Sequence, residues 1–458
     1  MLIGGCANTL TVVIGGQVLT GVAVGCSLLA SPTVQEIVPK KQRTIVMAFC
    51  TLISSGSFIA APIIEGVFIQ HGYGESLDGW RIGFYIGAAF WALCAIGLVL
   101  FFHPMPRPNP EGLTTVQQLR KFDWIGLFLA SAAMSLFLVG MNYGDNPYPW
   151  SSPMVLGPLV PGTISIFLFI LWEWKGTSTG LLPHALFEDR NFPLTMVIRI
   201  VGGIALFGGQ AFLPQVAVFV FGTDGTRTAV WQLPFTVSAM LGAFLAGGLL
   251  RFFKEIKWLI FASIMLMALG GGLCVLVKPN IGFVTWFFPC AFMGIAVGGE
   301  AMLLTVISGL AVPNRYIATG VCIGTSAGFL GGALATTIYG QVYRSKLKIY
   351  LPAAISNAAI TAGLPPSSLP SLLTGITTGD LASVPGATPI VLGAVQTASR
   401  NAYAKSFSYI WYVLIAWSAL SAVLALLYGS TSAYMTNEVA APVECRRRRT
   451  AATQREGK

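Results

Sequence analysis

The chain contains eleven runs of mostly apolar residues, each about twenty residues long, and few of them carry a charge. A helix of about twenty apolar residues crosses the ~30 Å hydrocarbon core of a bilayer. In lipid, only helices and closed barrels satisfy every backbone hydrogen bond. Because apolar residues follow one another here instead of alternating with polar ones, the runs predict helices. They cover residues 11–31, 45–69, 82–102, 124–142, 154–172, 194–217, 231–252, 258–277, 282–306, 316–339 and 407–428.

Composition supports an all-α, multi-pass integral membrane protein. Charged residues make up 10% of the chain, whereas a soluble domain has about 25%, so most of the surface faces lipid. The net charge of +10 lies in short loops and in the arginine run 446–449. No basic stripe interleaved with aromatic residues is present, which argues against nucleic-acid binding. The cysteines lack C-x-x-C spacing and the histidines are scattered, so we expect no metal site, disulfide framework or cofactor.

The basic residues predict the orientation of the spans. With the loop around Lys40 and Lys41 in the cytoplasm and strict alternation from there, 18 basic residues lie on the cytoplasmic side and 8 on the other. Cytoplasmic loops are the ones enriched in lysine and arginine. This orientation places Met1 outside, although no cleavable signal precedes the first span. We therefore expect the chain to be the remainder of a longer one.

Three charged residues, Arg199, Glu65 and Glu300, lie inside apolar runs. Such a charge costs about 2.5–3.5 kcal/mol on insertion scales, so we expect each to face a protein interior or a water-filled cavity. Arg199 and Glu300 each lie about six residues from the cytoplasmic end of a span, roughly 9 Å deep. At matched depth they predict an opposite-charge pair. That pair is a substrate or proton site. Alternatively, it is a structural ion pair, or Arg199 extends its side chain to the membrane–water interface.

Other polar and aromatic residues are candidates for the same path. Glu65 follows Pro62, where the helix should bend, and is either a proton carrier or a solvated carboxylate near the outer surface. Gln210 and Gln215 flank Pro214, where they can bind a ligand or satisfy freed backbone groups, and we favour Gln210 as a cavity residue. Four aromatic residues either form a wall for a large substrate or face lipid: Phe207, Phe212, Phe219 and Trp231.

Small residues predict close helix packing. Gly324, Gly328 and Gly332 recur at four-residue spacing, as do Gly21 and Gly25, and such spacing lets two helix backbones approach closely. The letters of 324–328 also match G-x-S-x-G, but a hydrolase elbow requires a strand-to-helix turn. Within an apolar helix the match has no catalytic meaning, and no enzyme is expected.

A helix-capping residue stands at the start of the fourth apolar run. Asp123 precedes this run and should cap the helix that follows.

The order of several motifs resembles a known transporter group. The segments 56–66 and 80–86 resemble the antiporter signature and the following helix of major facilitator drug:proton exporters. The segment 14–21 is similar to the fourth-helix motif of that group. The segments 122–126 and 182–192 are similar to its fourteen-span branch. Within that branch the chain looks most like the fungal trichothecene efflux pump family.

The resemblance implies a major facilitator bundle of the fourteen-span architecture without its first three spans. It makes Gly56, Pro62 and Gly66 the antiporter-motif residues. By its place in the fourth-helix motif, Gln17 is a further candidate for the substrate or proton pathway, although the group usually has arginine there. Glu65 stands where the group usually has glycine.

The implied activity is proton-coupled export of a hydrophobic toxin or drug, by a monomer in the plasma membrane. Protons would compete with the substrate for buried carboxylates, first Glu300 and then Glu65. The alternatives are an uptake permease for a chelated metal or nutrient, and a truncated, inactive or regulatory membrane protein.

These inferences divide the chain into six parts. The expected parts are 1–102, a three-span remnant of the N-terminal bundle; 103–180, two linker spans with a cytoplasmic loop; 181–340, the first five spans of the C-terminal bundle; 341–405, an extracellular loop; 406–430, the last span; and 431–458, a basic cytoplasmic tail.

Overall fold

A computed structural model gives the fold of most of the chain. It describes residues 1–30, 33–34, 38–39, 42–71, 79–101, 114–145, 147–177, 180–253, 255–313, 316–372, 385–386 and 388–430. The predicted basic tail and the loop lysines Lys40 and Lys41 lie outside this range, so their side of the membrane stays a prediction.

The described residues contain 11 helices long and apolar enough to cross a membrane, which confirms the predicted number. They are α2 (Leu10–Ser27), α4 (Arg43–His71), α5 (Trp80–Phe101), α7 (Trp124–Tyr143), α8 (Pro153–Leu171), α9 (Asn191–Phe219), α10 (Gly225–Phe253), α11 (Ile256–Val275), α12 (Phe283–Leu310), α13 (Ile317–Thr361) and α15 (Pro389–Leu426). Shorter elements are α1 (Leu2–Gly5), α6 (Thr115–Lys121), a π-helical turn at Trp172–Gly176 and 3₁₀ turns at His184–Leu186 and Pro366–Ser368.

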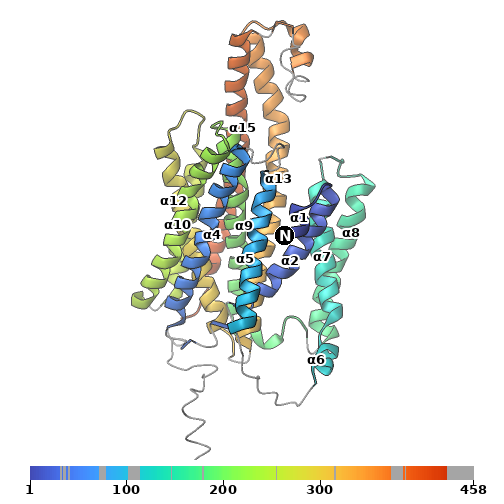
Figure 1. Cartoon of the computed structure of the whole chain (residues 1–458), viewed down its shortest axis with the longest axis vertical. Helices are drawn as coiled ribbons and strands as arrows, with labels where there is room; N and C mark the ends of the chain where they lie inside the picture. The colour runs from blue at the N-terminus through green and yellow to red at the C-terminus, as the bar shows by residue number, and fades with distance from the viewer. Residues whose placement is uncertain are drawn as a thin grey trace, which may run out of the picture.

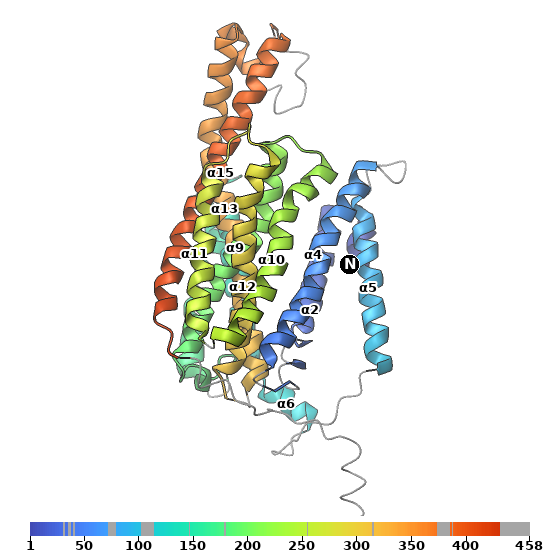
Figure 2. The same cartoon turned by 90° about the vertical axis from the view of Figure 1, so that its left-hand side faces the viewer.

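Six helices form the packed core of the molecule. α12 is the most buried span, and it packs against α9, α10, α11 and α13, while α15 covers α11 and α13 (Figures 1 and 2). α4 joins this bundle through α10, and α5 packs on α4 and α1. The antiparallel pair α7 and α8 joins it on another side, through a contact between α7 and α13. The division into N-terminal, linker and C-terminal parts at the predicted residue limits remains a prediction.

Glycines make the closest helix crossings. A Cβ atom at Gly298 in α12 would overlap the carbonyl oxygen of Ala239 in α10, and one at Gly203 in α9 would overlap that of Gly328 in α13. Close approach at small residues is how membrane helices associate. The predicted role of the 324–332 glycines is therefore confirmed at Gly328. In contrast, Gly21 and Gly25 of α2 have no neighbour within 4 Å, so the predicted close packing is not found there.

The segment predicted as the loop 341–405 is largely helical where the structure describes it. α13 continues to Thr361 and α15 begins at Pro389, so the two helices extend as a hairpin beyond the rest of the bundle (Figure 1). Thr388 caps α15 by accepting a hydrogen bond from the Val391 amide. The arms enclose a small apolar core of their own, formed by Ile355, Ala359, Leu364, Leu372, Val391 and Val395.

The linker pair α7–α8 is fixed at one end by two carboxylates. Asp123 caps α7, as predicted, by accepting from the Gly126 amide at 2.8 Å, and it also accepts from the Trp172 indole Nε1 at 3.0 Å. The buried Glu173 accepts from the amides of Leu181 and Leu182 at 2.9 and 3.1 Å. These bonds connect the end of α8 both to the start of α7 and to the segment that leads into α9.

Candidate functional site

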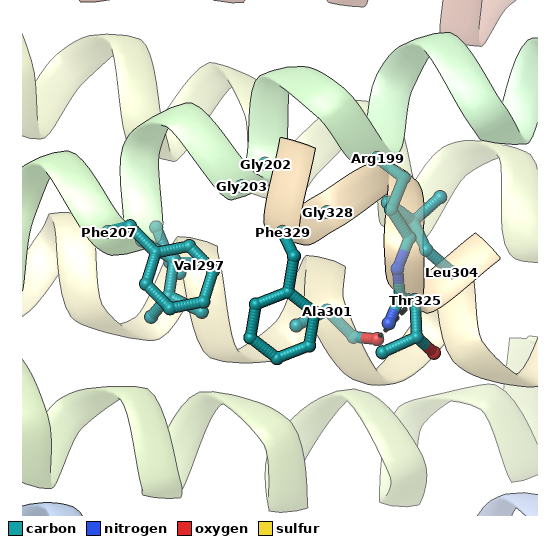
Figure 3. Close-up of a pocket in the computed structure, with 11 residues that line it drawn as sticks. Arg199, Gly202, Gly203, Phe207, Val297, Ala301, Leu304, Thr325, Gly328 and Phe329 are labelled. Carbon is teal, nitrogen blue, oxygen red and sulfur yellow. Dashed lines mark hydrogen bonds between the residues drawn. The ribbon is translucent and has the colours of Figure 1, made fainter. Parts of the chain in front are cut away.

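A cavity of about 130 Å³ lies between α9, α12 and α13 and is partly open to the outside. Three glycines, Gly202, Gly203 and Gly328, contribute backbone and no side chain to its lining. Most of its wall is apolar, and Figure 3 shows Arg199 at one end and two phenylalanine rings toward the other. The lining residues include Arg199, Gly202, Phe207, Ala301, Thr325 and Phe329.

Arg199 provides the cationic group of this cavity. Its Nη1 donates to the Thr305 hydroxyl at 2.8 Å and to the Ala301 carbonyl at 3.2 Å, both on α12. The Nε and Nη2 groups donate to no residue that the structure describes. Arg199 is half-buried and lines the cavity, so these remaining N–H groups are available to a bound molecule with an oxygen acceptor.

Glu300 lies behind the cavity wall. Its side chain has 0% exposure, and neither carboxylate oxygen accepts a hydrogen bond from any described residue. A Cβ atom at Gly202 would be 2.9 Å from Glu300 Oε1, so the carboxylate rests on Gly202, three positions after Arg199 on α9. A buried carboxylate without such partners is unusual, because desolvating a charge is costly unless it is paired and hydrogen-bonded.

The predicted ion pair is only partly correct. Arg199 on α9 and Glu300 on α12 form no direct salt bridge, although Arg199 reaches Ala301, the residue next to Glu300. The reason is that the guanidinium Nη1 binds Ala301 and Thr305, which follow Glu300 on the same helix. The two charges therefore interact through space, across the Gly202 position, and not through hydrogen bonds.

A second and larger cavity, of about 450 Å³, continues from the first along α9 and α13 and is wide open to the outside of the bundle. The two cavities share Phe207 and Phe329, whose ring centroids are 5.4 Å apart. Gln210 lines the second cavity, where the sequence placed it, together with Thr336. Gln215 instead donates to the Ala211 carbonyl at 3.0 Å, which satisfies backbone one turn before it in the helix.

Of the four aromatic residues predicted as a wall, only Phe207 lines either cavity. Phe212 packs edge-on against Tyr339 in the core, and Phe219 stacks on Tyr403 at 5.1 Å. Trp231 packs against neighbouring aromatic rings outside both cavities. Phe329 was not predicted, although the glycine run around it indicated that α13 approaches α9 closely.

Glu65 and the antiporter-motif residues lie apart from both cavities. The Glu65 carboxylate is half-buried and contacts Gly83 of α5. Gly66 meets the start of α10, since a Cβ there would be 2.9 Å from the Gly225 carbonyl oxygen. Gly56, on the same helix, has no neighbour within 4 Å. The motif in α4 thus contributes a helix contact, not a cavity wall.

Two further predicted positions have no cavity contact. Pro62 is inside α4, which continues past it. Gln17 is exposed on α2 and contributes to neither cavity. Among the residues that the structure describes, no three histidine, cysteine or acidic side chains come together as a group that could hold a metal ion.

Eleven helices long and apolar enough to cross a membrane, three of which line a cavity with one cationic end, are typical of a multi-pass membrane transporter. The sequence profile of the fungal trichothecene efflux pump family (TRI12) matches residues 1–455. The chain therefore belongs to this family, whose members are major facilitator transporters and not enzymes.

Individual relatives are similar along most of the chain. The MFS-type transporter prx5 of Penicillium rubens is 27% identical over 441 residues, which cover 94% of this chain and 79% of prx5. The trichothecene efflux pump TRI12 of Fusarium sporotrichioides is 22% identical over 453 residues, covering 96% and 74%. The solved structure of a bacterial homologue of the human lysosomal transporter Spinster has a TM-score of 0.43 at 14% identity, with 90% and 93% covered.

Proposed function

We propose that the chain exports hydrophobic small molecules in exchange for protons, as a monomer in the plasma membrane. The observation that supports coupling best is Glu300, a fully buried carboxylate without a hydrogen-bond partner among the described residues, beside a cavity that holds Arg199. The trichothecene efflux pump of Fusarium sporotrichioides supports export as the direction.

The mostly apolar wall of the two cavities favours an apolar substrate, and Arg199 and Gln210 favour one with a few oxygen acceptors. Such a molecule displaces water from Arg199 when it binds. The cost of that desolvation depends on whether a nearby negative charge balances the guanidinium. Ionised Glu300 supplies this balance and thereby favours the bound substrate.

A proton on Glu300 removes the balancing charge and leaves Arg199 as an uncompensated cation beside the apolar molecule. Water then solvates Arg199 better than the substrate does, and the substrate is released. Proton and substrate therefore compete, which is the requirement for exchange. Glu65, half-buried against α5, is the second carboxylate that we propose for proton transfer, and it acts away from the cavity.

The test uses the purified chain in liposomes with an imposed pH gradient and a panel of hydrophobic fluorescent dyes that includes Nile red. We expect dye to move against its own gradient and protons to move the other way. Glu300→Gln keeps the size of the side chain and prevents ionisation. In this variant the pH gradient should no longer drive dye movement.

Glu188→Gln, which changes an exposed carboxylate in the loop before α9, is the matched control and should transport as the unmodified chain does. Gradient-driven export that persists in Glu300→Gln would refute the coupling role of this residue. Dye movement in the same direction as protons would instead indicate uptake, the alternative transport reaction.

A further inference from the structure

The hairpin formed by α13 and α15 carries an unusual distribution of charge. Residues 341–406 contain one acidic residue, Asp380, and five basic ones. The basic residues are Arg344, Lys346, Lys348, Arg400 and Lys405. We call these five residues, with Tyr350 and Tyr409, the basic collar. Neither described arm of the hairpin contains a carboxylate, so the collar has the charge to attract an anion.

Contacts with neighbouring turns place the collar at the membrane surface. Lys348 Nζ lies 3.6 Å from Asp145 Oδ1, in the turn where α7 ends and α8 begins. The Arg400 guanidinium contacts Gly222, in the turn between α9 and α10. The turns that join four of the predicted spans therefore lie beside the collar, at the level where we expect lipid headgroups.

The tyrosines hold two of the lysines in fixed positions. The Tyr350 and Tyr409 hydroxyls hydrogen-bond each other at 2.8 Å, and their rings are nearly parallel. The Lys405 ammonium lies 4.1 Å from the centroid of the Tyr350 ring, and that of Lys346 lies 4.6 Å from that of Tyr409. An ammonium that contacts a ring on one side keeps its other N–H groups free for an anion.

One turn deeper along α15, an exposed tyrosine extends this surface into the apolar zone. Tyr412 packs edge-on against Tyr409, and 53% of its surface is exposed. Tyrosine is enriched where headgroups meet acyl chains. The surface thus presents cations at headgroup level directly beside an aromatic group at acyl-chain level, which fits the two parts of one lipid molecule.

We propose that the basic collar is a binding site for an anionic phospholipid, whose phosphate contacts Lys346 and Lys405 while its acyl chain packs on Tyr412. The site is on the end of the bundle that carries the hairpin, and it is independent of the transport reaction proposed above. Its occupant balances the charge of Lys346 and Lys405, whereas Asp145 lies beside Lys348.

The experiment compares lipids retained by the purified full chain after incubation with equimolar phosphatidylcholine and phosphatidylglycerol, measured by native mass spectrometry. We expect the unmodified chain to retain phosphatidylglycerol preferentially. Each lysine near a membrane surface contributes about fivefold to anionic-lipid binding, so Lys346→Gln with Lys405→Gln should lower that preference by about 25-fold. Lys346→Arg with Lys405→Arg should keep it.

Lys257→Gln is the matched control, because Lys257 also lies over an aromatic ring, Trp258, but at the start of α11. As a single cation at the end of a span, it should lower the preference by no more than about fivefold, well short of the double glutamine variant. Unfolding temperatures in pure phosphatidylcholine establish that each variant is folded. Equal retention of both lipids by the unmodified chain, or an undiminished preference in the double glutamine variant, overturns the proposal. Displacement of the lipid by millimolar inorganic phosphate would show a free-phosphate site instead, which also overturns it.

Discussion

The crossing of α10 and α12 allows a quantitative prediction about a single methyl group. In Gly298→Ala, the new Cβ would lie 2.6 Å from the carbonyl carbon of Ala239, 2.8 Å from its Cα, and in overlap with its oxygen. These are backbone atoms, so no side-chain rotation relieves the clash and the two helices must separate. Overpacking of this kind costs about 1–3 kcal/mol, and a backbone clash belongs at the upper end.

The intrinsic preference for alanine over glycine in a helix offsets about 1 kcal/mol of that cost. We therefore expect Gly298→Ala to lower the free energy of unfolding by about 2 kcal/mol, the difference of these two terms. Gly248→Ala measures the helix preference for alanine alone, because Gly248 is exposed on α10 and has no neighbour within 4 Å. That variant should be more stable than the unmodified chain by up to about 1 kcal/mol.

The two variants thus differ by about 3 kcal/mol, or roughly a hundredfold in the unfolding equilibrium constant. Titration of purified protein in mixed micelles with dodecyl sulfate, followed by tryptophan fluorescence, measures this difference. The critical result is the direction in which each substitution shifts the unfolding midpoint. If both substitutions shift the midpoint in the same direction, close backbone packing does not stabilise the α10–α12 crossing and our account of the core is incorrect.

Three other substitutions test the cavity and the residues packed around it. Phe207→Ala should weaken dye binding by roughly two- to tenfold, the value of one aromatic contact. The buried Phe212→Ala should instead destabilise the fold by about 3–5 kcal/mol with little change in affinity. Fluorescence titration and the dodecyl sulfate assay separate these outcomes. Thr305→Val keeps the side-chain shape but removes the acceptor of the 2.8 Å bond from Arg199. It should cost about 1 kcal/mol in the same unfolding assay, and no change in the midpoint would mean that this bond does not hold Arg199.

Hydropathy predicted the spans well because it measures the property that lipid selects. The limits of all eleven spans agree with the predicted ones to within six residues, except for the end of α13 and the start of α15. The cap at Asp123 follows from local chemistry alone. The length of α13 could not be predicted in the same way. Its apolar run ends near residue 339, but the helix continues to Thr361. Hydropathy reports the solvent around a helix, and it gives no signal where a helix leaves the membrane and packs against another arm in water.

The site shows a different limit of sequence reasoning. A charge in an apolar run predicts that something must compensate it, and Arg199 led us to expect Glu300 as the partner because both lie at the same depth. The structure instead gives Arg199 a hydroxyl and a backbone carbonyl. Every residue carries a carbonyl, so the sequence cannot indicate which one is accessible. Helix packing decides that, through glycines that bring α9 toward α12. Arg199 does not need Glu300 as a hydrogen-bond partner. A proton can therefore be placed on the carboxylate without breaking the contact that holds the cation, and this separation supports the coupling role that we propose for Glu300.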